Sequence, residues 1–224
     1  MKNYLLPYTV VSITQQDCKL LTTISCNTLD KPRNALLDRF GKIVLIFWQK
    51  QISKDEMLLV FPEVLYPRFL EHCEKYLKLS RAQWKRIDYF TYLVFHTENS
   101  FDKLGKEEIE IREEHFSIFL TKQKKEEIRD EKIFAYLRLH YNLPLQTIDY
   151  EKEMILNVFP QIASLTKGCY PGQEIVSRTM NYAKPPKKLT VLFEDELQEK
   201  ERKNMTSVLE ENGRKKGFCF VKNI

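Results

Sequence analysis

Hydrophobic and polar positions along the chain follow two different periods. Apolar residues recur every three or four positions in 67–79 and in 126–141, which predicts a helix in each segment. Asn142 can end the second helix in the left-handed conformation, and Pro144 prevents its continuation. Segments rich in β-branched and aromatic residues, the pattern typical of strands, occur at 8–13, 42–49, 57–61, 89–96, 109–112 and 117–120.

The pattern changes from Pro185 onward. Residues 189–193 alternate like a strand, Asn212-Gly213 is a strong signal for a two-residue hairpin turn, and 218–221 can form the return strand. Strands joined by short turns, with helices at two separate positions, predict an α+β fold of mostly antiparallel sheets.

The polar segment 97–107 interrupts the series of predicted elements and contains Gly105. We take it as the link between two halves of one fold. The chain is therefore predicted to have three parts: 1–96 as a first α+β half, 97–184 as a second α+β half, and 185–224 as a short C-terminal β segment.

Charge and hydropathy narrow the class of protein. The net charge is +5, but basic and acidic residues are interleaved, as at 122–127. This is typical of a solvated surface and not of a nucleic-acid-binding stripe, so no direct contact with nucleic acid is expected. No apolar run approaches the roughly 20 residues of a membrane span, and the N-terminal run is too short for a signal peptide. We therefore expect a cytoplasmic protein without a membrane partner.

The cysteines do not form a metal-binding or disulfide pattern. Their number is odd, their spacings are wide, and no CxxC pair occurs. We expect no metal site built from them and predict that most behave as small buried hydrophobes. The five are Cys18, Cys26, Cys73, Cys169 and Cys219.

The segment 167–174, with the sequence KGCYPGQE, has the most unusual composition. Two of the six glycines and a proline fall within it, which predicts a tight, rigid loop. Such a loop would present Cys169 in a defined direction. Lys167 lies two residues before it, and a nearby ammonium favours the thiolate, the form that acts as nucleophile or soft-metal ligand. The alternative interpretation is a structural turn with an inert buried cysteine.

This segment resembles a motif of the YgfZ family of folate-binding proteins, which support iron–sulfur enzymes. The family pattern KGCYxGQE, followed four residues later by an arginine, is matched at every fixed position, including Arg178. Weaker similarity extends over roughly residues 1–185. It includes Asn27 in 25–28, Asp38 in 35–43 and Arg138 in 138–144.

Three departures from the family are visible, and one is Asn142, which stands where the family usually has a glycine. The related aminomethyltransferases of glycine cleavage carry a pterin-recognising glutamate at the position matched by His140, and the C-terminal part is shorter than the usual β-barrel.

The resemblance implies the folate-binding fold of the glycine-cleavage T-protein, with a central channel that takes tetrahydrofolate. It implies Cys169 as the reactive residue, tuned by Lys167. The positions implied to contact the cofactor are Asn27, Asp38, Arg138, Tyr170, Gly172, Gln173, Glu174 and Arg178.

The function implied is that of an accessory protein for assembly or repair of iron–sulfur enzymes, with those client enzymes or cluster-assembly proteins as partners. One cysteine cannot hold a cluster alone, because clusters usually need about four thiolates. Cys169 would then act in a shared or transient site, or in thiol chemistry with a partner. Two alternatives stay open: a folate-dependent aminomethyl transferase, and a scaffold of the same fold without a ligand. We expect an accessory factor more than an enzyme.

Overall fold

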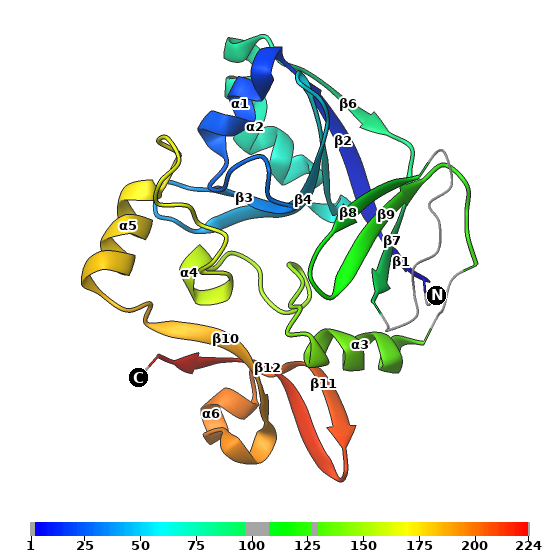
Figure 1. The fold of residues 1–224 in the computed structure, drawn as a ribbon. Helices are drawn as coiled ribbons and strands as arrows, with labels where there is room; N and C mark the ends of the chain where they lie inside the picture. The colour runs from blue at the N-terminus through cyan, green and yellow to red at the C-terminus, as the bar shows by residue number, and fades with distance from the viewer. Residues whose placement is uncertain (1–2, 97–107, 127–129, 224) are drawn as a thin grey trace.

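Three antiparallel sheets with helices packed against them make up the structure (Figure 1). The computed structural model describes residues 3–96, 108–126 and 130–223. All strand pairs in it are antiparallel, which confirms the predicted α+β class. The predicted link at 97–107 lies outside the described residues. None of the helices in the described part of the chain has both the length and the apolar composition needed to cross a membrane.

The largest sheet has five strands in the order β3-β4-β5-β2-β6. Successive residues of a strand point to opposite faces, so Phe47 packs in the cluster under the helices while Trp48 packs in the cluster on the other face. Helices α1 (Lys19–Ile24) and α2 (Tyr66–Ser80) cover the first face. The strands are β2 (Tyr8–Thr14), β3 (Arg33–Leu37), β4 (Ile43–Ser53), β5 (Glu56–Pro62) and β6 (Gln83–Ile87).

The second sheet lies against the open face of the first and has the order β1-β7-β9-β8. Helix α3 (Glu131–His140) packs on the same cluster, and its Phe134 ring lies 4.9 Å from that of Tyr4. The strands are β1 (Asn3–Leu6), β7 (Phe90–Phe95), β8 (Ile109–Arg112) and β9 (Phe116–Thr121). Because β7 pairs with β9, this sheet takes strands from both sides of the predicted boundary at 96/97.

The C-terminal sheet has the order β10-β12-β11 and joins the rest through Leu189 and Phe218, which pack with Leu139 and Phe159. The strands are β10 (Lys187–Phe193), β11 (Thr206–Glu211) and β12 (Arg214–Lys222). The predicted hairpin turn is confirmed: Asn212 and Gly213 connect β11 to β12 with φ of 53° and 75°, the two positive values of a type I′ turn.

Helix α3 differs from the sequence prediction in its start, and the helices other than α2 and α3 were not predicted. Helix α3 begins at Glu131 and not near residue 126, because the Asp130 side chain caps it by accepting the N–H of Ile133. Helix α5 (Gln173–Tyr182), at the edge of the molecule in Figure 1, was not predicted. The short elements are α4 (Ile155–Val158), α6 (Glu199–Arg202), η1 (Gln16–Cys18), η2 (Glu63–Leu65) and η3 (Glu194–Glu196).

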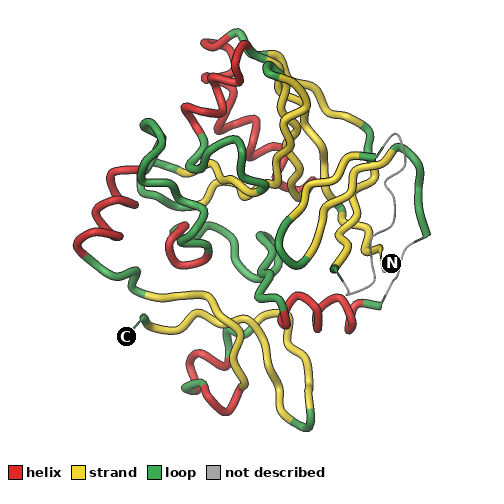
Figure 2. Tube along the Cα trace, viewed as in Figure 1, coloured by secondary structure: helices red, strands yellow, loops and turns green. Residues whose placement is uncertain are grey.

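Figure 2 shows that loops, and not regular elements, cross the middle of the molecule between the three sheets. The chain between α3 and α5 supplies most of them, with only the single turn of α4 in between. Irregular loop segments at this junction can line a cavity between the sheets.

Candidate functional site

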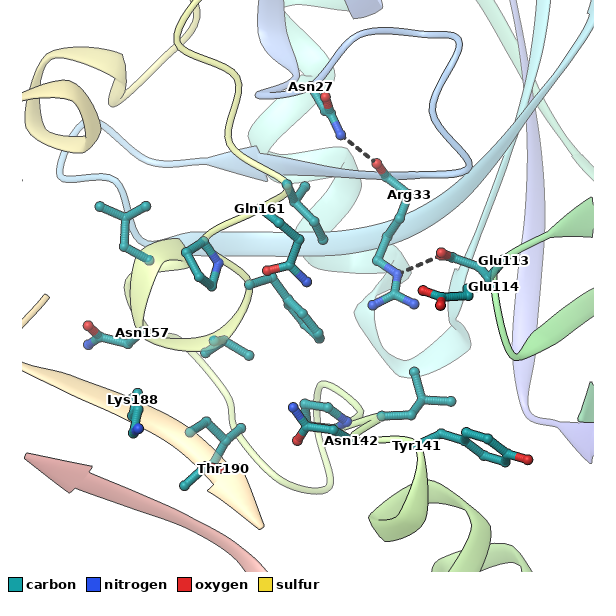
Figure 3. A pocket seen from close by; sticks show the side chains of 18 of the residues that line it. Asn27, Arg33, Glu113, Glu114, Tyr141, Asn142, Asn157, Gln161, Lys188 and Thr190 are labelled. Carbon is teal, nitrogen blue, oxygen red and sulfur yellow. Dashed lines mark hydrogen bonds and ion pairs between the residues drawn. The ribbon is translucent and has the colours of Figure 1, made fainter. Parts of the chain in front are cut away.

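A cavity of about 820 Å³ lies at this junction, and all three sheets contribute to its wall. Arg33 comes from β3, Glu113 and Glu114 from the β8–β9 turn, and Lys188 from β10 (Figure 3). Residues 141–144 after α3 and 156–162 around α4 also line it, as do Asn27 and Lys31 before β3. We call this cavity the central pocket.

A partly buried ion pair forms one side of the central pocket. Arg33 Nε lies 2.8 Å from Glu113 Oε1, and Trp48 Nε1 donates to the same oxygen at 3.1 Å. The Arg33 and Glu113 side chains are only 13% and 18% exposed, so the pair is largely removed from water. Within the described residues both donors reach Oε1, which leaves Glu113 Oε2 able to accept from a ligand.

Aromatic rings surround this pair. The Arg33 guanidinium lies 5.1 Å from the Phe159 ring and 5.7 Å from the Phe116 ring, within the range of cation–π contacts. Tyr141 lines the pocket further along and stacks on His115 at 5.0 Å. In Figure 3 the carboxylate of Glu114 lies beside the pair, and Lys188 lies across the pocket on β10. The pocket thus combines flat apolar walls, two carboxylates and a basic rim.

The predicted loop at 167–174 is anchored to the chain just outside this pocket. Lys167 Nζ donates to the backbone carbonyls of Ser25 at 2.5 Å and Asn27 at 3.1 Å. The Tyr170 hydroxyl donates to the carbonyl of Ser164 at 2.9 Å. Asn27 lines the central pocket, so one wall residue is held in place by the loop.

The Lys167 ammonium lies against this 25–27 segment. Burial lowers the pKa of Lys167, and the nearby Cys26 thiol opposes that shift. Cys169, two residues further, is exposed at the surface. A direct effect of Lys167 on the Cys169 thiol stays a prediction.

Gly172 fixes the end of the loop against the β3–β4 turn. Its φ is +81°, and a Cβ there would overlap the Asp38 carbonyl oxygen and lie 2.8 Å from the Gly41 nitrogen. Only glycine permits both that backbone conformation and that approach. Gln173 follows as the first residue of α5, and its Nε2 donates to the Lys167 carbonyl at 3.4 Å.

The Asp38 carboxylate holds its own turn. It accepts from the N–H groups of Phe40 at 2.9 Å and Lys42 at 3.0 Å, and pairs with Lys152 at 3.2 Å. Burial by itself raises the pKa of Asp38, but these donors outweigh it and hold the pKa below its usual value. Asp38 lines a second cavity and not the central pocket.

Arg138 lies in the core, where its guanidinium pairs with Asp149. Its Nε also donates to the Leu143 carbonyl at 3.3 Å. Asp149 accepts in addition from the hydroxyls of Thr206 at 2.9 Å and Ser207 at 2.6 Å. This geometry favours a structural role for Arg138, joining α3 to β11, over the ligand contact predicted from the sequence.

The predicted site residues thus separate into three groups. Asn27, Lys167, Tyr170, Gly172, Gln173 and Asp38 are connected through the loop and its anchors, while Arg138 lies apart. Cys169, Glu174 and Arg178 are exposed. Sequence reasoning missed Arg33, Glu113 and Trp48. They gave no local signal because Arg33 and Glu113 are 80 positions apart.

The fold of the chain is similar to that of a known enzyme, although sequence comparison finds no relative. No protein-family model and no curated protein sequence matches it. The solved structure of the glycine cleavage system aminomethyltransferase T from Bartonella henselae is similar, with a TM-score of 0.65 and 10% identity. The match covers 99% of this chain and 78% of that one. The chain therefore has an aminomethyltransferase-like α+β fold, as predicted, and the assignment to the YgfZ family stays a prediction.

Proposed function

We propose that the protein binds tetrahydrofolate in the central pocket and acts as an accessory protein in assembly or repair of iron–sulfur enzymes. The observation that carries the folate part is the central pocket itself, with the Arg33–Glu113 pair and its aromatic walls, at the junction of three sheets in an aminomethyltransferase-like fold. The accessory role rests on the YgfZ-type motif at 167–174 and on the exposure of Cys169.

The residues of the central pocket fit the chemistry of a folate. The pterin ring is flat and presents adjacent N–H donors, which a carboxylate can accept side by side. Glu113 Oε2 and the Glu114 carboxylate offer acceptors, and the rings of Phe116 and Phe159, which contact Arg33, line the same pocket. Lys31 and Lys188 at the rim offer charges for the glutamate carboxylates. About 820 Å³ is within the size range of pockets for ligands of this kind.

Tetrahydrofolate, when bound, would supply a carrier for one-carbon groups. The chain's own contribution would be to accept the pterin edge at Glu113, to keep water from it with the aromatic walls, and to fix Asn27 through Lys167. Cys169 does not line the pocket. Its exposed thiol is therefore available to a partner protein, in a shared cluster site or in thiol exchange.

Isothermal titration calorimetry with tetrahydrofolate under anaerobic conditions tests the ligand. We expect the Glu113→Gln variant to bind at least tenfold more weakly, because the amide replaces an acceptor with a donor. Glu210→Gln, an exposed position on β11 outside the pocket lining, is the matched control and should bind like wild type. Equal affinity in both variants, or no binding by folded wild-type protein, would contradict the folate proposal.

Complementation tests the accessory role. A bacterium lacking its own YgfZ-type protein would receive the wild type or the Cys169→Ser variant, and an iron–sulfur enzyme such as a tRNA methylthiotransferase would be assayed under oxidative stress. Rescue by the wild type alone supports the proposal with Cys169 as the reactive residue. Rescue by both keeps the pathway but makes Cys169 structural. Rescue by neither, with both proteins folded, rejects the role and favours a scaffold without a ligand.

The similarity to an aminomethyltransferase supports a second candidate, folate-dependent aminomethyl transfer. In that reaction a carboxylate would organise the folate nitrogen that attacks the carrier. Glu113 and Glu114 are the carboxylates in the central pocket. An assay for methylene-tetrahydrofolate formation from an aminomethylated lipoyl carrier decides: turnover lost in Glu113→Gln supports the transferase, and absence of turnover by folate-binding protein rejects it.

A further inference from the structure

A second cavity, of about 440 Å³, shares no lining residue with the central pocket. It lies between α2, the turn after β3 and the segment before α4. Helix α2 contributes Arg68, His72 and Lys75, which are spaced by four and three residues and so lie on one side of the helix. Asp38 and Lys152 line it from the other elements.

Some of the charged side chains that line this cavity already have a bonding partner, and others do not. The Asp38 carboxylate is already bound by two backbone N–H groups and by Lys152. Arg68 is held at 3.2 Å by Glu151, which does not line the cavity. Lys75 has no salt-bridge partner among the described residues, and its ammonium lies 4.7 Å from the centre of the Tyr76 ring. The remaining acidic group, Glu71, is exposed. Lys75 is exposed as well, and the three basic and two acidic residues that line the cavity give it a net charge of +1.

The unpaired ring nitrogen of His72 also indicates an anionic ligand. Its Nε2 is buried and has no hydrogen-bond partner within the described part of the chain. Buried polar atoms are normally paired, so an orphaned one indicates a missing partner. Burial, together with Lys75 and Lys152, lowers the pKa of His72, while Asp38 and Glu71 act in the opposite direction. An anion next to this ring would supply the partner and favour the protonated imidazole.

We propose that this cavity binds the oxyanion of a small molecule, a phosphate or carboxylate group, between Lys75, Lys152 and the Nε2 of His72. Lysine ammonium groups and imidazole N–H are charge-assisted donors for such a group. The cavity is larger than an oxyanion alone, which leaves space for the rest of the molecule beside Tyr76. The site is independent of the proposed folate pocket.

Histidine-ring NMR spectroscopy of the full chain tests this site, because the chain has only four histidines. The His72 signal is assigned by its loss in His72→Gln, and His96, His115 and His140 serve as internal references. The protein is titrated at constant ionic strength with inorganic phosphate, with pyrophosphate and with citrate. We expect a saturable shift of the His72 signal alone and a rise in the His72 pKa. Saturation by phosphate or pyrophosphate but not citrate assigns a phosphate group, and the reverse assigns a carboxylate.

Two lysine variants separate a built site from general attraction of anions. Lys75→Gln removes the charge that faces the cavity and should weaken binding at least tenfold. Lys85→Gln, at an exposed position of β6, removes the same charge elsewhere and should leave the affinity unchanged. The proposal is overturned if none of the three anions gives a saturable His72 shift, if all four histidines shift together, or if both lysine variants weaken binding equally.

Discussion

Burial separates Cys169 from the other four cysteines of the chain. Cys18, Cys26, Cys73 and Cys219 are buried, as predicted for most of them, whereas Cys169 is exposed. Burial raises the pKa of Cys26 and of Cys73 to about 12, and it also raises the pKa of Cys18 and Cys219. Because the thiolate is the reactive form, these buried thiols are inert at neutral pH.

Thiol labelling of the folded protein should therefore modify one residue. We expect a single fast-reacting thiol at neutral pH with an alkylating reagent, located at Cys169 by peptide mass spectrometry, and none in Cys169→Ser. A pKa near 12 lowers the thiolate fraction about a thousandfold relative to an ordinary cysteine. Denaturant should make all five thiols reactive. A second thiol reacting as fast as Cys169 in the native state would contradict this assignment.

The two glycines of the 167–174 loop give a matched pair for a second test. Gly172 has φ of +81° and touches the β3–β4 turn, whereas a Cβ on Gly168 would meet no atom within 4 Å. Gly172→Ala should lower the free energy of unfolding by about 2 kcal/mol or more, because it combines a strained φ with a steric overlap. Gly168→Ala should change it by less than about 1 kcal/mol. Urea denaturation measures both, and equal effects would show that the loop does not dock through Gly172.

At the scale of elements, predictability followed the strength of the apolar pattern. Helix α2 was predicted within a residue or so at each end because Phe69, Cys73 and Leu77 repeat at helical spacing and are buried. Helix α5 was missed because it is only 10 residues long and buries a single side chain, Val176, so its apolar repeat is short. Its position depends on Gly172 docking on a turn more than 130 residues earlier in the chain, a contact that no local pattern contains.

The pair of Arg138 and Asp149 connects elements across the molecule. Both side chains are almost completely buried, with 4% and 0% exposure. Arg138→Met would leave the Asp149 carboxylate buried without its counter-charge, which typically costs about 3–5 kcal/mol. Urea denaturation should show this loss, and hydrogen exchange should increase in β11, where Thr206 and Ser207 donate to Asp149.

The control for this pair is Lys78→Met, which breaks an exposed ion pair with Glu74 on α2. Exposed pairs contribute little to stability, so this variant should be indistinguishable from wild type. If Arg138→Met were equally harmless, the buried pair would not be what holds β11 to α3.

At the scale of the whole molecule, the α+β class and the C-terminal hairpin could be predicted, and the family resemblance implied a central channel, but most of the side chains that line the central pocket could not be predicted. The α+β class follows from the spacing of apolar residues within each segment, and the hairpin follows from Asn212-Gly213 alone. The pocket depends on Arg33 and Trp48, which are neighbours on β3 and β4, meeting Glu113 from the β8–β9 turn of another sheet. Contacts of this kind depend on how the sheets pack against each other, which no local sequence pattern specifies. Among the positions that the resemblance implied to contact the cofactor, Asn27 lines the central pocket, and the motif at 167–174 touches this wall through Lys167.

Because all three sheets line the central pocket, a ligand there should stabilise the whole chain and not one part of it. Binding to the folded state alone adds about 2.7 kcal/mol when the ligand is at 100 times its Kd. We expect tetrahydrofolate at that excess to raise the melting temperature and to slow hydrogen exchange in β3, β9 and β10 together. The same concentration should have a much smaller effect on Glu113→Gln, whose pocket has lost its acceptor. Protection confined to a single sheet would place the ligand outside the junction, because only a molecule in contact with all three walls couples their opening.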